Sequence, residues 1–139
     1  GCRQCPTALW QAGALNMNYL MVALGGALGA VARYAVYNAA ASGKASAQLA
    51  TFVINATGAL AIGVLYVVIT QRGGLQPYGQ QLLTVGFLGA FTTYSTYSLD
   101  ALRLLEQGQV GTAILYLLGT LLVCLAATWL GVSLTRQMF

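Results

Sequence analysis

The chain contains 139 residues with a formal net charge of +4; 58% of its residues are hydrophobic and only 6% are charged. Because it has no histidine and only two acidic residues, it lacks the side chains that build acid–base pairs, carboxylate metal cages and histidine-assisted nucleophiles, so we do not expect an enzyme. The mean hydropathy of +0.74 also argues against a water-soluble bundle, whose helices each carry a charged face.

Residues 1–16 differ from the remainder of the chain. They contain Cys2 and Cys5 in a Cys-x-x-Cys pair, but one such pair without histidine is weak support for a metal or redox site. Met17 directly precedes the first apolar stretch. We therefore predict that residues 1–16 are an N-terminal extension of unclear role and that residues 17–139 form a single domain.

Four apolar stretches follow, each close to the roughly 20 residues that a helix needs to cross a bilayer. They are residues 19–40, 47–70, 82–105 and 112–134. The connections between them are short and hold Gly, Pro, Gln and Lys, which favour turns. The sequence therefore predicts an all-α integral membrane protein with four transmembrane helices.

The basic residues at the ends of these stretches bear on orientation. If both termini lie on one side of the membrane, Arg3, Arg72 and Arg136 fall on that side and Arg33, Lys44 and Arg103 on the other. Because orientation follows the Lys/Arg asymmetry of short loops, this even balance predicts insertion in both orientations. A chain inserted both ways can assemble as an antiparallel two-fold homodimer, which is the arrangement we predict.

Small and polar residues interrupt the first two stretches. The glycines predict close helix packing; they are Gly25, Gly26, Gly29, Gly58 and Gly63. Asn55 lies within the second stretch, where its amide is unfavourable to bury without a partner. An interhelical hydrogen bond and a donor to an anion both satisfy that amide, and both interpretations stay open.

The segment 86–98, GFLGAFTTYSTYS, is the most unusual part of the third stretch. Its glycines and hydroxyl residues have low helix propensity, and irregular backbone survives in a bilayer only when it is buried in protein or lines a wet path. Such interruptions mark ion or substrate sites in transporters. We predict a functional break here, with Tyr94 and Tyr97 sharing one helix face.

In the fourth stretch, Tyr116, Thr120 and Cys124 recur at every fourth position and form a polar stripe on one helix face. Neutral hydroxyl, amide and ring-edge donors suit a small anion. A series of modest sites also lets an ion both enter and leave. The sequence therefore predicts an anion pathway built without charged side chains.

Two other classes of protein stay open at this point. A small multidrug or cation transporter shares this size and span count, but it needs a coupling carboxylate in the membrane interior, and the first stretch has none. Asp100, toward the end of the third stretch, fits a vestibule or interfacial position. A purely structural membrane subunit would not need the polar set of Asn55, Tyr94, Tyr97 and Tyr116.

The segment 86–98 resembles the central signature of the Fluc-type fluoride channels, also called the CrcB family, in which a Gly-rich turn precedes a Thr-Thr-aromatic-Ser-Thr-aromatic-Ser run. The resemblance extends to GGALGAVARY in the first stretch, FVINATGALAIG around Asn55 and residues 116–124 of the fourth. These segments follow the family's order and cover the chain from Asn18 to its C-terminus.

The resemblance implies a dual-topology homodimer in the cell inner (plasma) membrane, with two antiparallel pores that export fluoride passively and so lower its cytoplasmic concentration. The implied partners are a second copy, fluoride and membrane lipids, and no nucleic acid. One central structural Na+ is implied on the dimer axis, held by the backbone carbonyls of Gly89 and Thr92. The implied fluoride pathway consists of Asn55, Tyr94, Ser95, Thr96, Tyr97, Tyr116, Thr120 and Cys124. We expect Arg33 to anchor the end of its span or the vestibule, where a long basic side chain can snorkel; a direct contact with the anion is the alternative.

Two positions depart from the family pattern. The family commonly carries Phe where this chain has Tyr94 and Tyr97, and the added hydroxyls can donate to fluoride or bond elsewhere. Cys124 stands where a hydroxyl is usual, and a thiol is the weaker donor. From the thiol at Cys124 we therefore expect slower fluoride turnover, or a last site of the polar stripe that the ion does not use.

Overall fold

The computed structural model describes residues 7–75 and 78–138, and the regular elements of that part of the chain are all helices. In chain order they are α1 (Thr7–Ser42), α2 (Ala47–Arg72), the π-helix η1 (Gln80–Leu88), α3 (Gly89–Phe91), α4 (Tyr94–Glu106) and α5 (Val110–Met138). The all-α prediction is confirmed. Arg3, Cys2 and Cys5 lie outside the described residues, so the predictions made for them stay predictions.

Within residues 7–75 and 78–138, three helices are long and apolar enough to cross a membrane. They are α1 from Asn16 onward, α2 as far as Gln71, and α5, and they match the first, second and fourth predicted stretches. α1 begins at Thr7, inside the predicted extension. The third predicted stretch, residues 82–105, is divided among η1, α3 and α4, and none of these is long enough to span a bilayer alone.

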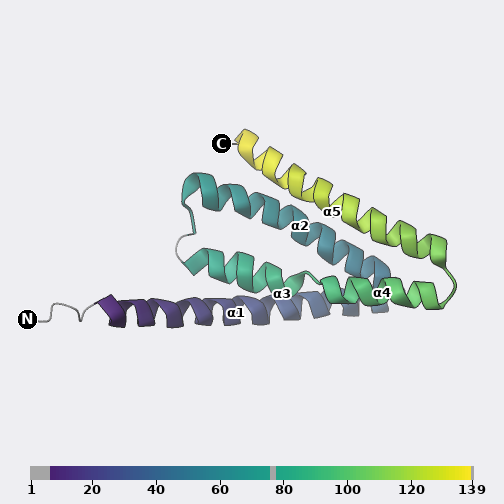
Figure 1. The fold of residues 1–139 in the computed structure, drawn as a ribbon, viewed down its shortest axis with the longest axis horizontal. Coiled ribbons are helices and arrows are strands. Elements are labelled where there is room, and N and C mark those ends of the chain that lie inside the picture. The colour runs from purple at the N-terminus through teal and green to yellow at the C-terminus, as the bar shows by residue number, and fades with distance from the viewer. Residues whose placement is uncertain (1–6, 76–77, 139) are drawn as a thin grey trace, which may run out of the picture.

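The helices run alternately in opposite directions along one long axis (Figure 1). α1 begins and α5 ends at one end of the molecule, where α2 also ends and η1 begins; α1 and α4 end, and α2 and α5 begin, at the opposite end. α2 packs along α5, whereas α1 packs along η1 and α3. Together η1, α3 and α4 make one pass in the direction of α1. Counted as α1, α2, the run from η1 to α4, and α5, the helical segments therefore alternate in direction; a membrane crossing by the run from η1 to α4 stays a prediction.

The helix pairs approach closely at glycines. A Cβ at Gly63 or Gly131 would collide with the backbone of the opposing helix in the α2–α5 pair, and one at Gly25 or Gly29 would collide with the backbone of η1. Gly26 has open space where its Cβ would be. Without a hydrophobic drive between helices in lipid, such backbone-to-backbone packing is a main source of their association.

Candidate functional site

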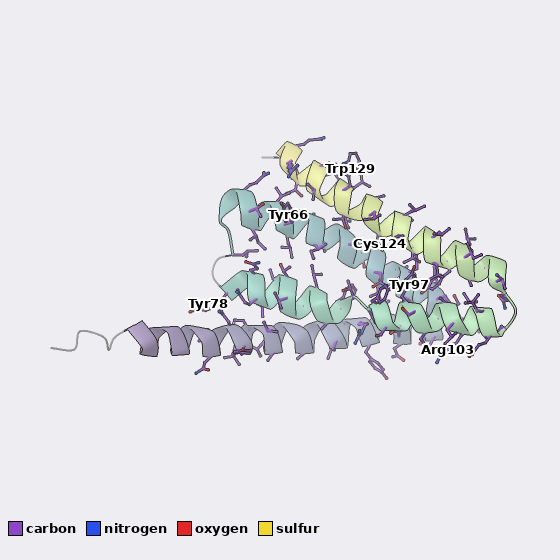
Figure 2. The ribbon with its side chains drawn as sticks, viewed as in Figure 1. Tyr66, Tyr78, Tyr97, Arg103, Cys124 and Trp129 are labelled. Carbon is purple, nitrogen blue, oxygen red and sulfur yellow. The ribbon has the colours of Figure 1, made fainter. Side chains whose placement is uncertain are left out.

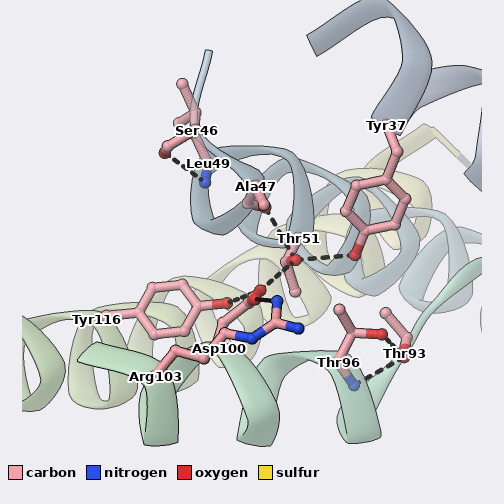
Figure 3. Close-up of polar contacts among 10 residues, drawn as sticks. All are labelled: Tyr37, Ser46, Ala47, Leu49, Thr51, Thr93, Thr96, Asp100, Arg103 and Tyr116. Carbon is pink, nitrogen blue, oxygen red and sulfur yellow. Dashed lines mark hydrogen bonds and ion pairs between the residues drawn. The ribbon is translucent and has the colours of Figure 1, made fainter. Parts of the chain in front are cut away.

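The helical run that contains η1 and α3 breaks at Thr92 and Thr93. Thr92 (φ −73°, ψ 155°) and Thr93 (φ −148°, ψ 120°) both have extended backbone. The Thr93 hydroxyl then caps α4 by accepting a hydrogen bond from the N–H of Thr96 at 3.3 Å (Figure 3). Capping by a hydroxyl is the usual way to satisfy the free amides at a helix start, so the hydroxyl-rich sequence explains why α4 begins where it does.

Asn55 of α2 holds this break from the opposite side. Its Nδ2 donates to the Thr93 carbonyl at 3.0 Å, and its Oδ1 accepts from the Thr93 N–H at 2.9 Å. The interhelical bond that the sequence left open is therefore present. Because an amide carries two N–H donors, one hydrogen of Nδ2 is still able to reach another acceptor.

A cavity of about 390 Å³ lies between α2, α5 and the segments on both sides of the break. It brings together most of the predicted residues: Asn55, Gly89, Thr92, Tyr94, Tyr97, Thr120 and Cys124. The predicted residues that do not line it are Arg33, Ser95, Thr96 and Tyr116. Figure 2 shows Cys124 and Tyr97 near each other between α5 and α4, whereas Trp129 points outward from α5.

The tyrosines form a row that leads away from the cavity. The ring centroids of Tyr94 and Tyr97 are 5.7 Å apart, and those of Tyr97 and Tyr116 are 5.3 Å apart. The Tyr97 hydroxyl donates to the carbonyl of Leu117 in α5 at 2.6 Å. Tyr94 is 79% exposed. Tyr97 is thus fixed between two neighbouring rings and α5, while Tyr94 lies at the open side of the cavity.

On α5, the residues that line the cavity include two of the three members of the predicted polar stripe and extend one turn beyond it. Thr120, Cys124 and Thr128 line the cavity, and Tyr116 does not. The Thr128 hydroxyl contacts the carbonyls of Ala59 at 3.1 Å and Cys124 at 3.0 Å. The same four-residue spacing, continued past Cys124, would have found Thr128; which end of a stripe faces a cavity depends on packing that spacing alone does not give.

Asp100 lies at the centre of a network that the sequence did not reveal. Its carboxylate is 1% exposed and accepts from the hydroxyls of Thr51 at 2.7 Å and Tyr116 at 3.5 Å. Tyr37 lies 2.8 Å from the Thr51 hydroxyl, and Arg103 lies 3.9 Å from the carboxylate (Figure 3). Hydroxyls of α2 and α5 thus contact the carboxylate directly, and Tyr37 of α1 is linked to it through Thr51. The vestibule or interfacial position of Asp100 stays a prediction, because burial within the protein does not give its depth in a membrane.

Residues 20–132 match the family model of the CrcB-like protein, Camphor Resistance (CrcB). A protein of Saccharophagus degradans is 39% identical to the chain, over 86% of the chain and 90% of its own length. One of Paracoccus denitrificans is 42% identical, over 90% and 99%, and one of Stutzerimonas stutzeri is 44% identical, over 83% and 94%. All three relatives bear the name fluoride-specific ion channel FluC.

Proposed function

The chain belongs to the CrcB-like protein family, and we propose that it is a fluoride channel through which fluoride leaves the cytoplasm passively. The observation that carries this function is the cavity, which gathers Asn55, Tyr97, Thr120 and other donors predicted for an anion pathway. Its relatives are named for the same ion. A channel catalyses no covalent reaction, so the chain is not an enzyme.

Fluoride crosses the cavity by exchanging water for neutral donors. The free hydrogen of the Asn55 amide, the ring edges of Tyr94 and Tyr97 and the hydroxyl of Thr120 serve this purpose. None of the described lining residues is charged. Weak sites of this kind favour conduction, because an ion that binds at a buried charge leaves slowly.

The two tyrosines differ in what their hydroxyls do. The Tyr97 hydroxyl is occupied by the Leu117 carbonyl, so only the ring edge of Tyr97 faces the ion, as the phenylalanine common in the family would. Tyr94 is largely exposed, and its hydroxyl remains available at the open side of the cavity. The added hydroxyl at Tyr97 therefore serves to join α4 to α5.

Three predicted pathway residues support the cavity from outside its lining. Tyr116 contacts Tyr97 through its ring and Asp100 through its hydroxyl. Thr96 accepts from the Thr93 hydroxyl at 3.1 Å, and Ser95 lies 3.4 Å from the same hydroxyl. We assign these residues to positioning the break and the aromatic row. Replacing one of them should therefore reduce ion flux less than replacing a residue that lines the cavity.

A structural Na+ at the break fits the residues present. In a continuous helix the N–H of Thr93 would donate to the carbonyl of Gly89, and the N–H of Thr96 to the carbonyl of Thr92. At the break, the Thr93 N–H donates to Asn55 instead, and the Thr96 N–H donates to the Thr93 hydroxyl. Carbonyl oxygens of this kind suit a hard cation. In the part of the chain that the structure describes, no group of three His, Cys, Asp or Glu side chains offers an alternative metal site. A bound Na+ would supply a fixed positive charge beside the anion pathway.

An antiparallel homodimer with two pores fits the exposed side of the cavity. Tyr94 and Leu121 line it yet are 79% and 53% exposed, so a single chain leaves the cavity open laterally. A second copy that covers this side completes the wall and excludes lipid from the polar donors. The even charge count and the three apolar helices support assembly from both orientations in the cell inner membrane.

The function is tested by fluoride efflux from liposomes that contain the purified protein, with chloride efflux measured beside it and no proton gradient imposed. Fast efflux of fluoride alone is the expected result. Asn55→Asp, which adds a negative charge to the lining and removes a donor, should abolish it. Fluoride that stays trapped while the protein is folded and dimeric would contradict the proposal, and flux that requires a proton gradient would favour a coupled transporter.

A further inference from the structure

We propose that the hydroxyl of Thr84, on η1, is a further donor to the permeating ion; this inference rests on the proposed function. Thr84 lines the same cavity as Thr120, but it belongs to the segment before the break, whereas Tyr94 and Tyr97 follow it. The anion pathway then extends past the break onto η1, a segment to which the sequence assigned no site residue.

The hydroxyls of Thr84 and Thr120 differ from those of most other threonines in the helices. A helical threonine commonly bonds the carbonyl four residues earlier. In this chain Thr51, Thr57, Thr70, Thr92, Thr128 and Thr135 all do so. The hydroxyl oxygens of Thr84 and Thr120 are buried and have no partner among residues 7–75 and 78–138. Both are thus buried threonine hydroxyls with an unused donor, and both belong to the cavity wall.

Thr84 lies within a π-helical turn, η1. The N–H of Gly89 reaches back to the carbonyl of Thr84, a five-residue bond that widens the helix at this point. Threonine in a helix populates two χ1 rotamers, and rotation between rotamers about the Cα–Cβ bond brings the hydroxyl to a new direction without any movement of the backbone. The Thr84 hydroxyl can therefore turn toward an anion in the cavity and turn back when the anion leaves.

Thr128 shows why lining the cavity is not sufficient. Its side chain lies in the same wall, but its hydroxyl is occupied by the carbonyls of Ala59 and Cys124. A hydroxyl has one hydrogen to donate, so Thr128 can serve an anion only by giving up a bond that joins α5 to α2. Thr84 has no such bond to lose.

The test is fluoride efflux from liposomes for Thr84→Val, which keeps the shape of the side chain and removes the hydroxyl, and for Thr84→Ser, which keeps the hydroxyl. Thr57→Val is the matched control, because it removes a helical hydroxyl outside this cavity. We expect efflux to fall about fivefold in Thr84→Val, as loss of one hydrogen bond predicts, and to stay near the wild-type rate in Thr84→Ser and Thr57→Val.

Equal efflux in Thr84→Val and the wild type would overturn the inference, and so would an equal loss in Thr57→Val. If Thr84→Val does not form the folded protein, Thr84→Ala compared with Thr84→Ser answers the same question. If the wild-type protein itself releases no fluoride, the proposed function has failed. If the wild type conducts fluoride and Thr84→Val conducts it equally well, this inference is refuted and the proposed function stands.

Discussion

Replacing Asn55 with alanine tests the part of the structure on which the break depends. The change removes both hydrogen bonds to Thr93, a residue that is only 6% exposed, so its N–H and carbonyl lose their side-chain partner. Each buried group left unsatisfied costs about 1–3 kcal/mol. The Thr93 carbonyl also accepts the first hydrogen bond of α4, as the carbonyl of a capping residue does, so it stays partly satisfied. We therefore expect the free energy of unfolding to fall by about 2–4 kcal/mol, which is less than the full cost of two unsatisfied groups.

The assay is chemical unfolding in detergent micelles followed by circular dichroism. Asn38→Ala is the control, since it deletes the same side chain from an exposed position on α1, where surface changes stay within about 0.5 kcal/mol. We also expect Asn55→Ala to slow fluoride efflux, because the cavity loses an amide donor as well as the shape of the break. An Asn55→Ala protein as stable as Asn38→Ala would refute the role of Asn55 in holding the break.

Three further predictions concern packing, the aromatic row and access to the cavity. Gly25→Ala should destabilise the fold by about 1–3 kcal/mol, the usual range for overpacking, whereas Gly26→Ala should not, because Gly25 meets the backbone of η1 and Gly26 faces open space; the difference in unfolding midpoint checks this. Tyr97→Phe should lose its bond to Leu117 and about 0.5–1.5 kcal/mol of stability, yet keep fluoride efflux within about twofold, since the hydroxyl gives the ion no hydrogen bond; a complete loss of efflux would count against this view. A methanethiosulfonate reagent should block efflux by modifying Cys124 in the cavity wall, while Cys124→Ser channels treated in the same way should conduct as before.

The sequence predicted the residues that meet at the cavity better than it predicted their individual tasks. Asn55, Tyr97, Thr120 and Cys124 all line one cavity, because a bilayer forces polar side chains of apolar helices toward the protein interior. That rule groups the polar residues of different spans. It does not say whether a donor contacts an ion, as proposed for Thr120, or holds backbone in place, as Asn55 does at Thr93.

The network around Asp100 could not be predicted from local spacing. Its partner Thr51, and Tyr37, which contacts Thr51, lie far away along the chain and come near Asp100 only through helix packing. Spacing also places Tyr116 on the polar stripe of its helix without showing that its hydroxyl contacts the carboxylate of Asp100. A helix wheel gives the face on which a residue lies, but the rotation of that helix against its neighbours decides what the face contacts.

The central claim, that the chain conducts fluoride selectively through its cavity, is tested most directly by the reversal potential in a planar bilayer. With unequal fluoride concentrations and equal chloride on the two sides, we predict a current that reverses at the equilibrium potential of fluoride. With equal fluoride and unequal chloride concentrations on the two sides, the reversal potential should be zero. A reversal potential that follows the chloride gradient, or the absence of any current with folded protein in the bilayer, would contradict the account.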